Sequence, residues 1–266
     1  MNTGPIIVVT GGNRGIGFEI CRQLSGRGAR VVLTARKPEA GAAAVKKLAA
    51  QNLATQFHPL DVTATESIAA LRNFLERTCG RLDVLINNAG IISEGDAPGL
   101  EVDMATVRAT LETNALAPLH LSQTLVPLLK RSKSARIVNV SSGMGALSEM
   151  EGGYAAYRIS KTTLNAVTTI LAAELRGAVA VNSACPGWVR TRTNRKAIAI
   201  IRQSCSDSLA IANPTDGVFG SDSRFCQGCI ICTTLRPTSG RPATRMNDTW
   251  GAGADQWHRN LSPGLR

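Results

Sequence analysis

The sequence predicts an α/β fold, a doubly wound parallel sheet with helices on both faces, followed by an atypical C-terminal tail. Up to about Asn194, short β-branched runs alternate with long amphipathic stretches, which is typical of repeated strand-helix-strand units. The 266 residues are 44% hydrophobic but only 4% aromatic, a composition that suits parallel strands buried between helices. We therefore expect a single domain over residues 1–194 and assign residues 195–266 to the tail.

Six strands are predicted where β-branched residues cluster between turn residues. They cover residues 6–10, 30–35, 55–59, 84–87, 136–140 and 178–184. Helices are predicted between them over residues 15–27, 38–52, 64–79, 101–131 and 155–176. Thr63 and Glu66 have the spacing of a capping box ahead of the apolar residues of the third helix, so we expect Thr63 to cap that helix.

A glycine-rich loop, TGGNRGIG over residues 10–17, joins the first strand to the first helix. Glycines at this turn let the backbone approach a pyrophosphate closely, and the helix N-terminus offers it free amide groups. The strand before the loop and the helix after it favour a dinucleotide site of the Rossmann type over an ordinary turn. The residues expected to hold the cofactor here are Gly11, Asn13, Arg14, Gly15, Ile16 and Gly17.

The end of the second strand indicates which dinucleotide binds. An enzyme that prefers NAD places an acidic side chain there for the ribose hydroxyls, but no acid occurs before Glu39. Arg36 stands there instead, and Arg14 lies on the same side, so two guanidinium groups can bind a 2′-phosphate. We predict NADP(H), with two solvated surface arginines as the alternative.

A serine, a tyrosine and a lysine form the candidate catalytic set. The fifth strand delivers Ser142 to its carboxyl end, and Tyr157 and Lys161 follow four residues apart on one helical face. The lysine ammonium and an oxidised nicotinamide are both expected to lower the pKa of the phenol, which then exchanges a proton with a substrate oxygen held by Ser142. Tyr154 is the competing acid, but its fourth neighbour is Arg158, whose pKa is too high for proton exchange.

These motifs, together with Asp61-Val62, Asn87 to Gly90, Asn114 and Pro186-Gly187, resemble in order and spacing the short-chain dehydrogenase/reductase family. The likeness covers residues 6 to about 194 and is greatest to the NADPH-dependent carbonyl reductases, through the sequences GGNR, LTAR and LDVL. It implies an NADP(H)-dependent oxidoreductase that transfers hydride between the nicotinamide and a carbonyl or alcohol substrate, with Tyr157 as general acid/base.

The resemblance also implies roles for further residues. Asn114 is expected to hold a water beside Lys161 in the proton relay, and Thr191 to reach the carboxamide or the pyrophosphate. Asp61 and Val62 are expected to border the adenine. The implied cofactor-binding residues outside the glycine loop are Arg36, Asp61, Val62, Asn88, Ala89, Gly90, Tyr157, Lys161, Pro186, Gly187, Val189 and Thr191. For the stretch from Asn88 to Gly90, simple turn residues are the alternative.

The chain departs from the family pattern in two places. The segment between Ser142 and Tyr157 lacks the long insertion of some monomeric carbonyl reductases, so the helix faces near 101–131 and 155–176 stay available for a homodimer or homotetramer. After Asn194 there is no Glu and only one Lys, and neither the substrate-covering helical segment nor the last strand of the family can be recognised. Our hypothesis is that the tail replaces both with non-homologous sequence, such as an altered reading frame gives, and poor order of the tail is an open alternative.

Composition excludes several other classes. Lys and Arg are scattered as singles and pairs despite a net charge of +11, which argues against nucleic acid. The apolar run at the N-terminus is only five residues long and has no basic leader, so we expect no membrane span and a cytoplasmic location. Cys226, Cys229 and Cys232 have ligand-like spacing without the fourth cysteine of an iron–sulfur motif, and we predict no metal. The alternative function is an NADP(H)-binding protein with weak or no catalysis, because an altered tail leaves the substrate pocket open to water.

Overall fold

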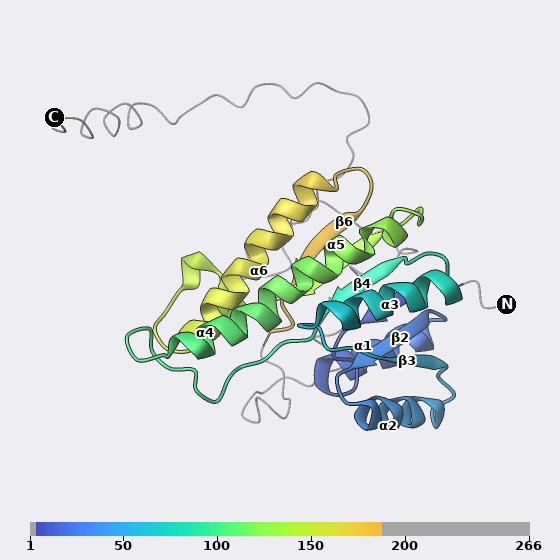
Figure 1. Cartoon of the computed structure of the whole chain (residues 1–266), viewed down its shortest axis with the longest axis horizontal. Helices are drawn as coiled ribbons and strands as arrows, with labels where there is room; N and C mark the ends of the chain where they lie inside the picture. Colours follow the sequence, from blue (N-terminus) through green and yellow to red (C-terminus); the bar gives the residue numbers. More distant parts are fainter. Residues whose placement is uncertain (1–3, 188–266) are drawn as a thin grey trace, which may run out of the picture. The chain divides into compact units, whose positions relative to one another are not determined.

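A computed structural model describes residues 4–187 of the chain. Six strands form one parallel sheet in the order β3-β2-β1-β4-β5-β6 (Figure 1). The strands are β1 (Ile6–Val9), β2 (Arg30–Ala35), β3 (Thr55–Pro59), β4 (Val84–Asn87), β5 (Arg136–Val140) and β6 (Ala180–Ala184). The strand order reverses between β1 and β4, so the predicted doubly wound sheet is confirmed, with its switch point beside the glycine loop.

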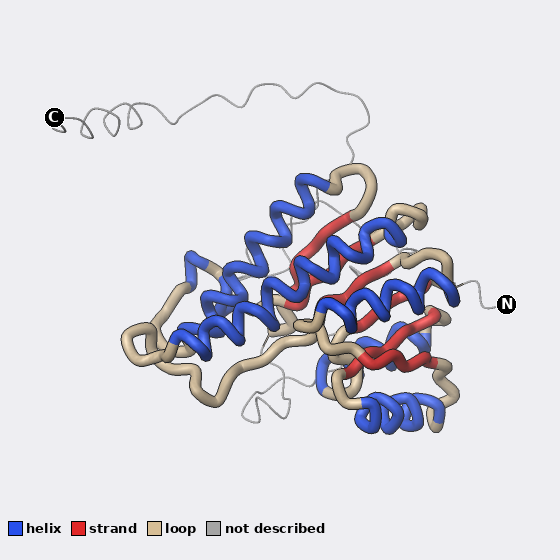
Figure 2. Tube along the Cα trace, viewed as in Figure 1, coloured by secondary structure: helices blue, strands red, loops and turns tan. Residues whose placement is uncertain are grey.

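Helices cover both faces of the sheet (Figure 2). They are α1 (Gly15–Gly26), α2 (Pro38–Ala49), α3 (Thr65–Thr78), α4 (Met104–Leu111), α5 (Ala117–Leu129) and α6 (Ala155–Glu174), with short 3₁₀ turns at Gly143–Gly145 and Leu147–Glu149. Alternate strand residues face opposite layers, as a period of two requires. Ile7 and Val9 pack with α1 and α2, whereas Ile6 and Val8 pack with α3, α5 and α6.

Two of the local predictions were wrong. The helix predicted over 101–131 begins at Met104, because the Asp103 carboxylate accepts the Thr106 amide at 2.8 Å and so caps α4. A π-helical turn, Glu112–Leu116, then separates α4 from α5. Thr63 does not cap α3, whose first flanking residue is Ala64, since the Thr63 amide and hydroxyl both donate to Asp61 Oδ1, at 3.0 and 2.8 Å.

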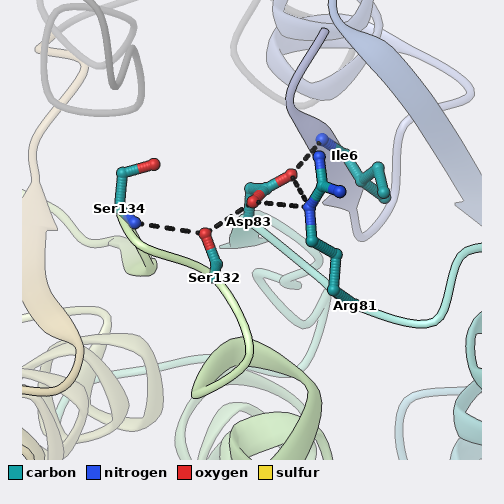
Figure 3. Close-up of polar contacts among 5 residues, drawn as sticks. All are labelled: Ile6, Arg81, Asp83, Ser132 and Ser134. Carbon is teal, nitrogen blue, oxygen red and sulfur yellow. Dashed lines mark hydrogen bonds and ion pairs between the residues drawn. The ribbon is translucent and has the colours of Figure 1, made fainter. Parts of the chain in front are cut away.

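A buried carboxylate holds the amino edge of the sheet together (Figure 3). Asp83, only 5% exposed, accepts hydrogen bonds from the Ile6 amide at 2.7 Å and from the Ser132 hydroxyl at 2.5 Å. The Arg81 guanidinium donates to both of its oxygens at 3.2 Å. The network therefore joins the start of β1, the start of β4 and the turn before β5, at the edge opposite the glycine loop.

Within residues 4–187 no helix combines the length and the apolar character needed to cross a membrane. The predicted cofactor residues Val189 and Thr191, and the whole tail with its cysteines at 226, 229 and 232, lie outside the described residues.

Candidate active site

The glycine loop is fixed to the sheet through Thr10. The Thr10 hydroxyl oxygen accepts the backbone amides of Asn88 and Ala89, both at 2.9 Å, and the Asn88 side-chain amide donates to the Thr10 carbonyl at 2.8 Å. Gly12 donates its amide to the Thr34 carbonyl at the end of β2, at 2.9 Å. The loops after β1 and β4, which the sequence predicts at one cofactor site, are thus held side by side.

The glycines of the loop stand where the backbone packs too closely for a side chain. A Cβ on Gly17 would lie 2.4 Å from the Asn88 side-chain nitrogen and 2.4 Å from the Gly11 carbonyl oxygen. Gly11 has a φ of +62° and Gly15 a φ of +57°, which favour glycine. The loop then enters α1 at Gly15, with Asn13 and Ile16 partly exposed beside its first turn. This is the geometry that a pyrophosphate on a helix N-terminus requires.

Charged residues follow at the ends of β1, β2 and β3. Arg14 and Arg36 are both exposed, and neither forms an ion pair within residues 4–187. Hydrogen bonds from Thr63 hold the pKa of Asp61 below its usual value, and the positive charge of Arg36 lowers it further. Val62, the residue after Asp61, is partly buried against the core. Two guanidinium groups are thus available at the point where a 2′-phosphate is expected.

The serine, tyrosine and lysine come together at the carboxyl edge of the sheet. The two serines after β5 have different partners. Ser141 is buried and donates to Asn165 Oδ1 at 2.8 Å, whereas Ser142 forms a hydrogen bond with Tyr157. The Lys161 ammonium is buried, lies 5.6 Å from the centre of the Tyr157 ring and donates to the Val140 carbonyl at 2.8 Å.

Close packing fixes the segment after Ser142 against α6. A Cβ on Gly145 would lie 2.7 Å from the backbone carbonyl carbon of Lys161, so only glycine fits there. The Gly145 carbonyl accepts from the Thr162 hydroxyl and the Asn165 side chain, both at 3.1 Å. Ser142 therefore has a defined place relative to the tyrosine and the lysine.

The pKa of Tyr157 is raised above its usual value, which corrects the lowering expected from the Lys161 ammonium, while the lowering expected from an oxidised nicotinamide stays a prediction. Burial of the phenol is the main cause; the hydrogen bond from Ser142 lowers the pKa, and the charge of Cys185 raises it. Burial also lowers the pKa of Lys161, to about 8. The phenol consequently keeps its proton at neutral pH.

Asn114 lies in the π-helical turn and bridges two segments of the site. Its side chain accepts the Ile91 amide at 2.8 Å and donates to the Ile91 carbonyl at 2.9 Å and to the Ser160 hydroxyl at 3.0 Å. A Cβ on Gly90 would lie 3.2 Å from Asn114 Oδ1 and 3.7 Å from the Lys161 nitrogen, so the chain approaches both side chains closely here.

The structure separates the two candidate tyrosines. Tyr154 has its side chain in solvent, 54% exposed, and precedes α6 with a left-handed φ of 48°. Tyr157 lies in the first turn of α6 and faces Ser142 and Lys161. Pro186 and Gly187 follow β6 after Cys185, at the same edge of the sheet. This arrangement favours Tyr157.

Sequence reasoning missed three residues of this edge: Thr10, Asp96 and Cys185. Thr10 is the first residue of the glycine-loop motif but was given no role, and Cys185 directly precedes Pro186-Gly187, so position alone could have suggested both. Asp96 belongs to a loop without regular pattern, and its contacts are to residues about sixty positions away, at Ala156 and Tyr157. No feature of the sequence points to that pairing.

Comparison with known proteins agrees with this geometry. The family model described as short chain dehydrogenase matches residues 5–199. The (+)-neomenthol dehydrogenase of Arabidopsis thaliana is 34% identical, over 77% of this chain and 90% of that protein. The carbonyl reductase [NADPH] 3 of Rattus norvegicus is 37% identical, over 70% and 82% of the two chains. The solved structure of NADPH-bound carbonyl reductase from chicken fatty liver matches with a TM-score of 0.70 and 28% identity, over 79% and 92%.

Proposed function

Because the chain belongs to the short-chain dehydrogenase family, we propose that it transfers hydride between NADP(H) and a carbonyl or alcohol substrate, with Tyr157 as the general acid/base. It is an oxidoreductase of the carbonyl reductase-like kind, and its cofactor is NADP(H). The observation that carries the proposal is the meeting of Ser142, Tyr157 and Lys161 at the sheet edge that also holds the glycine loop.

The described residues fit a phosphorylated dinucleotide. The glycine loop would take the pyrophosphate at the N-terminus of α1, since Gly11 and Gly17 let the loop pack closely against Asn88 and Ala89, and Arg14 and Arg36 would hold the 2′-phosphate. Asp61 and Val62 would lie near the adenine, and Asn88, Ala89 and Gly90 would line the far side with Pro186 and Gly187. When bound, the cofactor supplies or accepts the hydride.

The chain's own residues would manage the proton. With its pKa raised, Tyr157 remains a phenol at neutral pH and can donate its proton to a carbonyl oxygen during reduction. Ser142 would hold that oxygen by a hydrogen bond. Lys161, with a pKa of about 8, can return a proton to the phenolate afterwards, and Asn114 would hold the water that links it to solvent.

We further propose an oligomeric state and a domain boundary. A homodimer or homotetramer through α4, α5 and α6 is supported by exposed apolar residues on two of these helices, Met104 on α4 and Ile159 and Ile170 on α6. The domain boundary near Asn194 is supported by the end of the family match at residue 199.

The same boundary supports a second candidate, an NADP(H)-binding protein with weak or no turnover. The family match leaves the last 67 residues uncovered, from 200 to 266, and the substrate-covering part of the family follows the same point of the chain. An open pocket weakens catalysis more than cofactor binding, because water competes for the hydrogen bonds of Ser142 and Tyr157.

One set of measurements separates the two candidates. Purified protein is assayed for NADPH binding and for oxidation of NADPH or NADH with a panel of ketones, quinones and aldehydes. We expect turnover with NADPH that Tyr157→Phe lowers by about 100-fold or more and Tyr154→Phe leaves within about twofold. NADPH binding without turnover favours the second candidate, and a larger loss in Tyr154→Phe than in Tyr157→Phe contradicts the assignment of the acid.

A further inference from the structure

Helix α6 carries Tyr157 and Lys161 but has no cap of its own. Its flanking residue Tyr154 is in the left-handed region, with φ 48° and ψ 45°, and makes no side-chain cap hydrogen bond. An ordinary N-cap residue is extended and uses a Ser, Thr, Asp or Asn oxygen to accept an amide of the first turn. The conformation at Tyr154 rules that solution out, so the amides of Ala155, Ala156 and Tyr157 need acceptors from elsewhere.

Two consecutive residues of a distant loop supply all three acceptors. The Ala97 carbonyl accepts the Ala155 amide at 3.0 Å. The two carboxylate oxygens of Asp96 accept the amides of Ala156 and Tyr157, each at 2.9 Å. A carboxylate also compensates the positive end of the helix dipole. The capping group is therefore a bidentate anion that binds the backbone of the proposed acid itself.

The same loop begins at the cofactor side of the site. Asn114 pairs with both the amide and the carbonyl of Ile91, just after the stretch from Asn88 to Gly90. The loop then runs from Ile91 to Asp96. Asn114 also donates to the Ser160 hydroxyl, which donates to the Tyr157 carbonyl at 2.8 Å. Tyr157 is thus bound at its amide by Asp96 and at its carbonyl through Ser160.

We propose that Asp96 is a positioning residue, which sets the place of Tyr157 relative to Ser142 and the cofactor by binding the first turn of α6. The proposal rests on the proposed function for its catalytic consequence. Asp96 contacts the backbone amide of Tyr157 and not its side chain. The groups that face the Tyr157 phenol are Ser142, Lys161 and Cys185. Its removal is expected to displace the phenol and not to withdraw a proton donor.

The neighbouring loop offers a matched control. Asp103 caps α4 with the same chemistry, since it accepts the Thr106 amide at 2.8 Å and the Thr106 hydroxyl at 2.5 Å. It makes no hydrogen bond to α6 within the described residues. Asp103→Ala therefore removes a carboxylate cap without touching the first turn of α6, and any effect shared by both variants belongs to helix stability.

Steady-state kinetics with NADPH and a reducible carbonyl test the catalytic consequence. We expect Asp96→Ala to lower kcat by about tenfold or more with the Kd for NADPH within about twofold, because a small misplacement of a reacting group is costly. Asp96→Asn, which keeps one acceptor oxygen, is expected to fall between the wild type and Asp96→Ala. Asp103→Ala is expected to stay within about twofold of wild-type kcat. Equal losses in Asp96→Ala and Asp103→Ala that follow their Tm values would overturn the proposal.

A spectroscopic test does not need turnover. The chain has only two tyrosines, so protein labelled with carbon-13 at the tyrosine ring carbon bearing oxygen gives two resonances, assigned with Tyr154→Phe. We expect Asp96→Ala and Asp96→Asn to move the resonance of Tyr157 and its titration, whereas Asp103→Ala moves neither. An unchanged Tyr157 resonance in both Asp96 variants would reject the positioning role even in a protein without activity. A wild type without turnover whose Tyr157 resonance still responds to Asp96 would reject only the proposed function.

Discussion

The two edges of the sheet treat buried polar groups in opposite ways. At the amino edge, the Asp83 carboxylate is surrounded by donors from Ile6, Arg81 and Ser132. At the carboxyl edge, the Lys161 ammonium is buried with one hydrogen bond, to Val140, and no ion pair among residues 4–187. The first arrangement offsets the cost of burying a charge, and the second leaves it partly uncompensated. One edge therefore stabilises the fold, and the other holds the lysine that we propose takes part in proton exchange.

Replacement of Lys161 should give the largest contrast between the edges. Lys161→Met is expected to lower the rate of NADPH oxidation by about 100-fold or more, because the proton relay loses its lysine. It is expected to raise the free energy of unfolding at neutral pH, because burial lowers the pKa of Lys161 to about 8 and so disfavours its charged form. Steady-state kinetics and urea unfolding measure the two effects.

The sign of the stability effect depends on pH. The unfolded chain binds a proton at Lys161 up to about pH 10, whereas the folded chain loses it near pH 8, so wild-type stability relative to Lys161→Met rises between these values, by up to about 3 kcal/mol. A constant difference from pH 7 to pH 10 would show that Lys161 is not destabilised by burial, and the comparison of the edges would fail.

Loss of Asp83 should affect the other edge alone. Asp83→Ala leaves the Ile6 amide and the Ser132 hydroxyl without their buried acceptor, and we expect the free energy of unfolding to fall by about 2–4 kcal/mol. The Kd for NADPH of the folded protein is expected to stay within about twofold, as measured by fluorescence titration. Ser132→Ala, which removes one donor, should cost about 1 kcal/mol. A tenfold weaker Kd in Asp83→Ala would mean that the two edges are coupled.

The smallest expected effect concerns the choice of cofactor. Arg36→Ala is expected to weaken NADPH binding by about tenfold and to leave NADH binding unchanged, because the guanidinium is assigned to the 2′-phosphate. Lys46→Ala is the matched control, since Lys46 is an exposed cation in the last turn of α2. Equal weakening of NADPH and NADH binding by Arg36→Ala would restore the alternative of a surface arginine.

Strand positions, both helical layers and the serine, tyrosine and lysine were predictable, because each depends on local periodicity or on a short motif. The failures share a different cause. Thr63 has the sequence of a cap, but the Asp61 carboxylate competes for its hydroxyl. The pKa of Tyr157 depends on burial, which spacing does not reveal. Asp96 acts on a helix sixty residues away, so only the folded chain brings them together.

The π-helical turn at Glu112–Leu116 determines how the helix on one side is rotated relative to the helix on the other. An α-helix turns by about 100° for each residue, and a π turn accommodates one extra residue without carrying that rotation onward. Asn114 faces Ile91 and Ser160, while Leu121 and Leu125, about two and three turns later, face the core. Deleting one residue of the π turn other than Asn114 would therefore close it into an ordinary α-helical turn and keep both sets in place. A deletion in α4 or in the part of α5 before Leu121 has no such turn to absorb it and would rotate one set away from its partners.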